Sequence, residues 1–117
     1  MLSRPVLACA MFIASTAGAQ DIGGSYLIQG RNFDGSAYGG QAEIVRTSDV
    51  TCEIYWTTGS TTSQGICMRS GDVFSAAYKL GSAVGLVIYR IGQNGVLDGT
   101  WTVAGSNGVG YELLLPQ

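Results

Sequence analysis

The sequence predicts an all-β fold: a small antiparallel meander, most simply an eight-stranded barrel, with a β-sandwich as the alternative. Three observations support this prediction. Apolar and polar residues alternate with a period of two, and no convincing stretch after residue 19 has the 3.6-residue period of a helix. Turn-forming pairs recur at short intervals. Proline is absent from Asp21 to Leu115, as strands paired on both sides require.

The first residues have the features of a signal peptide. Met1–Arg4 is short and basic, and Val6–Ala14 is apolar but too short to span a bilayer as a helix. Ala17–Ala19 has the small-x-small pattern of a cleavage site. We therefore expect residues 1–19 to be a signal peptide and residues 20–117 to form a single all-β domain in a periplasmic or secreted protein. A retained N-terminal anchor is the alternative.

Turn-forming pairs divide residues 20–117 into eight segments. Asp-Gly and Asn-Gly pairs favour type I′ turns, because both central residues need positive φ, and Gly-Ser pairs suit type II′ turns. In chain order the pairs are Asp34-Gly35, Ser48-Asp49, Gly59-Ser60, Gly71-Asp72, Gly81-Ser82, Asn94-Gly95 and Asn107-Gly108. Short connections of this kind predict eight strands in up-and-down order.

The segments between the turns carry apolar residues on one face. The faces expected to point inward are formed by Tyr26 and Ile28; Tyr38, Ala42 and Ile44; Val50, Cys52, Ile54 and Trp56; Phe74, Ala76 and Tyr78; Val84, Leu86 and Ile88; Leu97, Gly99, Trp101 and Val103; and Val109, Tyr111, Leu113 and Leu115. Bends of the kind that close a small barrel are predicted at glycines inside strands. These are Gly40, Gly65, Gly85, Gly99 and Gly110.

Two cysteines of the predicted domain lie in one hairpin. Its strands are Val50–Thr57 and Ser63–Arg69, joined at Gly59-Ser60. Cys52 and Cys67 lie equally far from this turn, so they face each other across the hairpin. We expect a disulfide, which is compatible with export and contributes roughly 3 kcal/mol for a loop of about 15 residues. Two unpaired core thiols are the alternative.

The charge is weakly acidic, with a formal net charge of −2. Basic residues after residue 19 are scattered rather than clustered: Arg31, Arg46, Arg69, Lys79 and Arg90. Without a basic patch, counterion release cannot drive binding to nucleic acid. No polybasic or amphipathic segment suits a membrane surface. The sequence therefore argues against nucleic-acid and membrane partners.

Catalytic groups are scarce. Histidine is absent, which removes the usual general base and the commonest metal ligand, and two cysteines without histidine make a poor zinc site. The alternation places Glu53, Asp98 and Glu112 on polar faces. We therefore predict no catalytic residue, no metal, no cofactor and no enzymatic activity. An inward, unpaired Glu43 or Glu112 would argue otherwise.

Aromatic residues are the remaining candidates for binding. Trp56 and Trp101 fall on inward faces, where they either fill the core or line a cavity for an apolar ligand. Tyr55 and Tyr89 fall opposite inward positions. We therefore expect both tyrosines on the outer surface, where they are candidates for a patch that binds a protein.

Several stretches of the chain resemble a family of small exported bacterial proteins. They are Gly24–Tyr26, Asp34–Tyr38, Thr51–Trp56, Gln64–Arg69, Ala83–Tyr89 and Leu97–Trp101. Members are mostly uncharacterised, and some are labelled fibronectin-binding. The resemblance implies a similar fold and export, but it gives no site residue.

Gly99–Ser106 is also similar to the Gly-x-Trp…Gly-Ser opening of avidin-type barrels. The stretch lies near the C-terminus rather than on the first strand, and Thr102 replaces the family's asparagine. This second resemblance implies a likeness of fold without biotin binding.

These observations favour a non-enzymatic, exported binding module that acts on another protein through its outer surface, such as an inhibitor or an adhesin. The alternative function is a carrier of a small apolar ligand in a barrel similar to avidins or lipocalins, with Trp56 and Trp101 as stacking surfaces. The sequence identifies neither the ligand, nor the partner, nor the oligomeric state.

Overall fold

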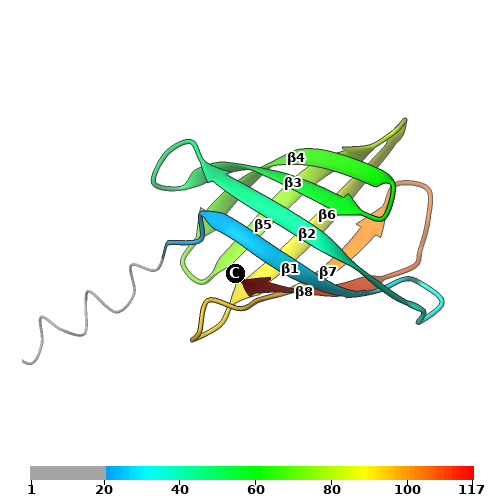
Figure 1. Cartoon of the computed structure of the whole chain (residues 1–117). Coiled ribbons are helices and arrows are strands. Elements are labelled where there is room, and N and C mark those ends of the chain that lie inside the picture. The colour runs from blue at the N-terminus through cyan, green and yellow to red at the C-terminus, as the bar shows by residue number, and fades with distance from the viewer. Residues whose placement is uncertain (1–20) are drawn as a thin grey trace, which may run out of the picture.

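The computed structural model describes residues 21–117, which form a closed antiparallel barrel (Figure 1). The strands are β1 (Gly24–Arg31), β2 (Ala37–Arg46), β3 (Thr51–Thr58), β4 (Thr61–Ser70), β5 (Val73–Leu80), β6 (Ala83–Ile91), β7 (Leu97–Val103) and β8 (Gly110–Pro116). Each strand pairs with the next, and β8 pairs with β1. The predicted eight-stranded meander barrel is confirmed, and the sandwich is wrong. The predicted signal peptide, residues 1–19, lies outside the described residues.

The connections alternate between the two ends of the barrel. The β1–β2, β3–β4, β5–β6 and β7–β8 connections lie at one end, on the right in Figure 1, which we call the open end. The β2–β3, β4–β5 and β6–β7 connections lie at the other end with the C-terminus, and we call this the closed end.

Two turns differ from the predicted type. Gly35 and Gly95 have φ of 87° and 77°, but no non-glycine residue among 21–117 has a positive φ. The Gly35 amide donates to the Asn32 carbonyl at 2.9 Å, and the Gly95 amide donates to the Gly92 carbonyl at 3.2 Å. These are type I turns followed by a left-handed glycine, not type I′ turns. The turn predicted at Asn107-Gly108 lies earlier, at residues 104–105.

Large side chains pack in the interior of the barrel. The largest fully buried side chains are Tyr89, Phe74, Ile44, Ile54, Leu97, Leu114 and Val87. Phe74 and Tyr89 stack with ring centroids 4.7 Å apart. Ile22 precedes β1 and is buried, and its carbonyl accepts a hydrogen bond of 2.6 Å from the Tyr26 hydroxyl. This contact fixes the start of β1 against the core.

The predicted disulfide is confirmed. Cys52 of β3 lies opposite Cys67 of β4, and the two are bonded with their Cα atoms 4.9 Å apart. Both side chains are buried. The bond therefore links two adjacent strands inside the barrel wall.

In β6 the predicted inward face is reversed. The expected residues are on the outer surface, between 48% and 56% exposed: Val84, Leu86 and Ile88. Residues 83–89 are apolar on both faces, so alternation cannot decide which face is inward. Strand pairing decides it, because Tyr89 lies opposite Phe74 of β5 and Gly99 of β7.

In β8 the face is reversed as well. Gly110, Glu112 and Leu114 point inward, whereas Tyr111 is exposed. Gly110 lies opposite Trp101, which points inward from β7, and this pairing fixes the orientation of the strand. The expectation that Glu112 lies on a polar outer face is therefore wrong, since this side chain is 6% exposed.

The glycines inside strands have two roles. Gly40 and Gly65 approach a neighbouring backbone, because an added Cβ would lie 2.0 Å and 2.2 Å from carbonyl oxygens of the next strand. Other inward glycines lie under an aromatic ring of the adjacent strand. These pairs are Gly30 with Tyr38, Gly85 with Tyr78, Gly99 with Tyr89 and Gly110 with Trp101. Each ring lies across the barrel wall where a side chain is missing.

Candidate functional site

The open end of the barrel contains a cavity of about 440 Å³. Its wall carries aromatic side chains from four strands: Tyr38, Trp56, Tyr78 and Trp101. Small polar residues line its rim, among them Thr58, Thr61 and Ser63. Glu112 is the only charged residue that lines it among residues 21–117. A second hollow of about 350 Å³ lies at the closed end and is lined by loop residues and charged side chains, among them Asp21, Arg46 and Asp49. The open end is therefore distinguished by its aromatic wall.

Glu112 lies at the inner part of this cavity and accepts three hydrogen bonds. The Tyr38 hydroxyl donates to Oε1 at 2.7 Å, and Trp56 Nε1 donates to Oε2 at 2.9 Å. The Tyr89 hydroxyl also donates to Oε2. Trp56 Nε1 lies 3.1 Å from the Tyr89 hydroxyl as well. These donors compensate for the loss of solvation around a buried carboxylate.

The strand register explains how two distant tyrosines reach one carboxylate. On one side, Gly30 of β1 lies between Tyr38 of β2 and Glu112 of β8. On the other side, Gly99 of β7 lies between Tyr89 of β6 and Glu112. An added Cβ would lie 2.1 Å from Tyr38 at Gly30 and 2.7 Å from Tyr89 at Gly99. Each tyrosine therefore crosses a glycine to meet Glu112.

The tyrosine hydroxyls around the cavity are held in their protonated form. Burial, followed by the charge of Glu112, raises the pKa of Tyr78 to about 12. The same two causes raise the pKa of Tyr38 and Tyr89 well above the ordinary value. Since a protonated phenol can donate, Tyr38 and Tyr89 act as hydrogen-bond donors to Glu112 at neutral pH.

Trp101 differs from the other aromatic residues of the cavity. Its ring packs across Gly110 and against Phe33, with centroids 4.8 Å apart. Tyr38 lies edge-to-face with the indole, with ring centroids 6.2 Å apart. Nε1 is buried and has no hydrogen-bond partner in the described part of the chain. A donor is therefore left unused at the cavity wall.

The four residues predicted for binding lie in different parts of the structure. Trp56 and Trp101 lie on the inner face and line the cavity. Tyr55 is on the outer surface, 39% exposed, but Tyr89 is 0% exposed, so its predicted outer position is wrong. The reversal of β6 is the reason, and the two tyrosines do not share a surface. Glu43 is exposed, and Glu112 is inward but hydrogen-bonded.

Sequence reasoning missed the central role of Glu112 and its tyrosine partners. The available signal was the set of glycines inside strands, since Gly99 and Gly110 were expected only to bend the chain. A glycine opposite an inward aromatic residue also makes room for that ring.

Within residues 21–117, no group of three or more acidic, cysteine or histidine side chains could hold a metal ion. The same residues include no helix long and apolar enough to cross a bilayer.

Three of the solved structures similar to this chain are redesigned or de novo designed barrels. A redesigned β-barrel has 15% identity and a TM-score of 0.72, covering 86% of this chain and 96% of its own. A redesigned β-barrel bound to DFHBI has 18% identity and a TM-score of 0.70, covering 84% and 98%. A de novo designed fluorescence-activating β-barrel has 15% identity and a TM-score of 0.67, covering 86% and 98%. At such identities the likeness concerns the fold alone.

Neither a family model nor a curated protein matches the chain. The sequence resemblances are therefore supported only as a likeness between barrels. The fibronectin-binding label receives no support from these comparisons.

Proposed function

We propose that this protein binds a small, largely apolar molecule in the open end of the barrel. The observation that carries this proposal is the cavity of about 440 Å³ at the open end, whose wall carries four aromatic side chains. Small-molecule sites have volumes on the order of 300–1,000 Å³ and combine apolar walls with a few polar groups. The aromatic wall, the polar rim and Glu112 match that description.

We take the protein to be a non-enzymatic carrier in the periplasm or outside the cell. The designed barrel that is bound to DFHBI shows that a similar fold accommodates a small molecule.

Fluorescence of the neutral probe N-phenyl-1-naphthylamine tests the proposal. Ser63 lines the cavity from β4, while its neighbour Gln64 is exposed on the outer face. The Ser63→Phe variant should fill the cavity and weaken probe binding about tenfold or more, since a phenyl ring would take up ligand space. The matched Gln64→Phe variant should bind like the wild type. Equal binding by both variants, or no saturable binding by the wild type, would overturn the proposal.

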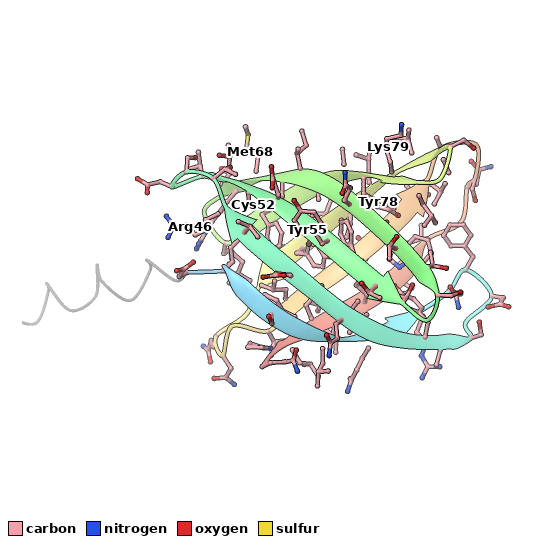
Figure 2. All side chains as sticks on the ribbon, turned by 45° about the horizontal axis from the view of Figure 1, so that its top comes forward. Arg46, Cys52, Tyr55, Met68, Tyr78 and Lys79 are labelled. Carbon is pink, nitrogen blue, oxygen red and sulfur yellow. A yellow bond between two sulfur atoms is a disulfide. The ribbon has the colours of Figure 1, made fainter. Side chains whose placement is uncertain are left out.

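A second candidate function is binding of a protein partner through the outer face of β4–β6. Ile66 and Met68 of β4 are 70% and 62% exposed, and Figure 2 shows Met68 pointing away from the barrel. In the register they lie in rows with Leu86 and Ile88 of β6, separated only by small residues of β5. An apolar surface of this kind is typical of contact sites. This candidate replaces the predicted pair of Tyr55 and Tyr89.

The Ile66→Ser/Leu86→Ser double variant tests this second candidate. A partner recovered with the wild type from envelope extract should be lost with the variant and retained with the Ser63→Phe variant, whose outer face is unchanged. Unchanged recovery with the double variant would exclude this face as the contact site.

A further inference from the structure

The cavity has an uneven charge balance. Glu112 is its only charged residue among those described, and its hydrogen-bond partners are all neutral. Ion pairs between described residues lie on the surface, where Arg46 contacts Asp21 and Asp49 and Arg90 contacts Asp72. The carboxylate therefore contributes a negative charge that no basic side chain of the cavity wall balances.

The aromatic wall presents ring faces to the cavity. Tyr38, Tyr78 and Trp101 each lie against a glycine of the adjacent strand, within 2.2 Å of where its Cβ would be. One face of each ring therefore covers the barrel wall. The rings also contact other aromatic side chains, since Phe33 lies 4.8 Å from Trp101 and Trp56 lies 5.1 Å from Tyr78 between ring centroids. The face of an aromatic ring is the negative part of its quadrupole, so the wall attracts positive charge.

Both observations indicate that the cavity accepts a positively charged group. We propose that its ligand is an organic cation, a protonated or quaternary amine on an apolar body, with the charged group held between the aromatic rings beside Glu112. This inference rests on the proposed function and specifies its ligand class. An apolar body matches the aliphatic part of the wall, formed by Leu80, Val87 and Val103.

The carboxylate has capacity for this ligand. An ionised carboxylate accepts about four hydrogen bonds, and Glu112 accepts one at Oε1 and two at Oε2 from side chains. Oε1 can therefore accept a further bond from an ammonium N–H. A quaternary amine lacks this donor and is held by the charge and the ring faces alone. An anionic ligand would instead face Glu112 without a compensating cation.

Three probes of similar shape distinguish the charge classes. These are the cation phenyltrimethylammonium, its neutral isostere tert-butylbenzene and the anion benzenesulfonate. Each competes with N-phenyl-1-naphthylamine for the wild-type protein. The cation should displace the dye at a concentration about tenfold lower than its neutral isostere, because only the cation gains from the ring faces and the carboxylate. The anion should be the weakest competitor.

The Glu112→Gln variant should reduce the preference for the cation, while the Glu53→Gln variant on the outer face should retain it. If Glu112→Gln does not fold, the ranking of the three probes on the wild type still tests the preference for a cation. A neutral isostere that competes as well as the cation, or an anion that competes best, would overturn the cation proposal and leave small-molecule binding intact. Failure of the dye itself to bind would instead overturn the proposed function.

Discussion

Tyr89 donates a hydrogen bond to Glu112 from two strands away, across Gly99. Tyr38 reaches the same carboxylate from the opposite side, across Gly30. The five residues form one row around the barrel, and the row connects β2, β6 and β8. Since Trp56 of β3 donates to Glu112 too, the carboxylate links four strands that are not all neighbours. We expect this network to be important for stability.

Tyr89→Phe should destabilise the protein by about 1.5–3 kcal/mol, the range for a hydrogen bond to a charged group. The variant keeps the ring over Gly99 and removes only the hydroxyl. Urea unfolding followed by tryptophan fluorescence measures the change. The control is Tyr55→Phe, because the Tyr55 hydroxyl donates to Glu53 Oε1 at 2.8 Å on the outer surface. There we expect a change within about 0.5 kcal/mol. Equal effects would show that burial of the network is not important.

The sequence was sufficient to predict features that depend on close neighbours in the chain. Cys52 and Cys67 face each other because the Gly59-Ser60 turn has two residues, and the observed register agrees. The number and order of the strands also follow from local turn chemistry. The cavity residues Trp56 and Trp101 are inward for the same reason, since polar residues alternate with them.

The orientation of β6 was not predictable in this way, and the turn at Asn94-Gly95 is part of the reason. A two-residue type I′ turn would place Tyr89 opposite Thr100. The type I turn with its additional residue places Tyr89 opposite Gly99 instead. A shift of one residue exchanges the two faces of a strand. Because β6 is apolar on both faces, its composition could not reveal the exchange, and Tyr89 was assigned to the wrong side. In β8 the apolar residues Tyr111, Leu113 and Leu115 favoured the opposite face, so Glu112 was assigned to the outside.

Gly99→Ala should destabilise the protein by about 1–3 kcal/mol, because the added methyl group would overpack the buried ring of Tyr89. Its Cβ would lie 2.7 Å from Tyr89 ring atoms. The control is Gly39→Ala, whose Cβ would meet only the Ile28 carbonyl oxygen at 3.5 Å. That variant should be neutral or more stable by up to about 1 kcal/mol, since alanine is less flexible than glycine. Thermal unfolding of both variants measures these changes in stability. A Gly99→Ala protein as stable as the wild type would refute the close contact between Gly99 and Tyr89.

Stability should decline as the pH rises from 10 towards 12. The pKa of Tyr78 is raised from 10.0 to about 12 in the folded protein, through burial and then the charge of Glu112. Above pH 10 the unfolded chain releases a proton that the folded protein retains, so unfolding becomes progressively favourable. Urea midpoints at pH 8, 10 and 11 measure the decline. Tyr78→Phe should reduce its slope, whereas Tyr111→Phe on the exposed face should not. A flat profile between pH 8 and 11 would contradict the prediction.

Removal of the disulfide should lower stability without changing the cavity. Cys52 and Cys67 are separated by 15 residues, a loop for which the chain-entropy model gives about 3 kcal/mol. The Cys52→Ala/Cys67→Ala double variant should lose roughly this amount in urea unfolding. Dithiothreitol should destabilise the wild type in the same way and leave the double variant unaffected. The intact mass of the wild type should be higher after reduction than before it, by the mass of about two hydrogens.

Neither cysteine lines the cavity at the open end, so the folded double variant should bind N-phenyl-1-naphthylamine with unchanged affinity. A large loss of affinity would show that the two ends of the barrel are coupled.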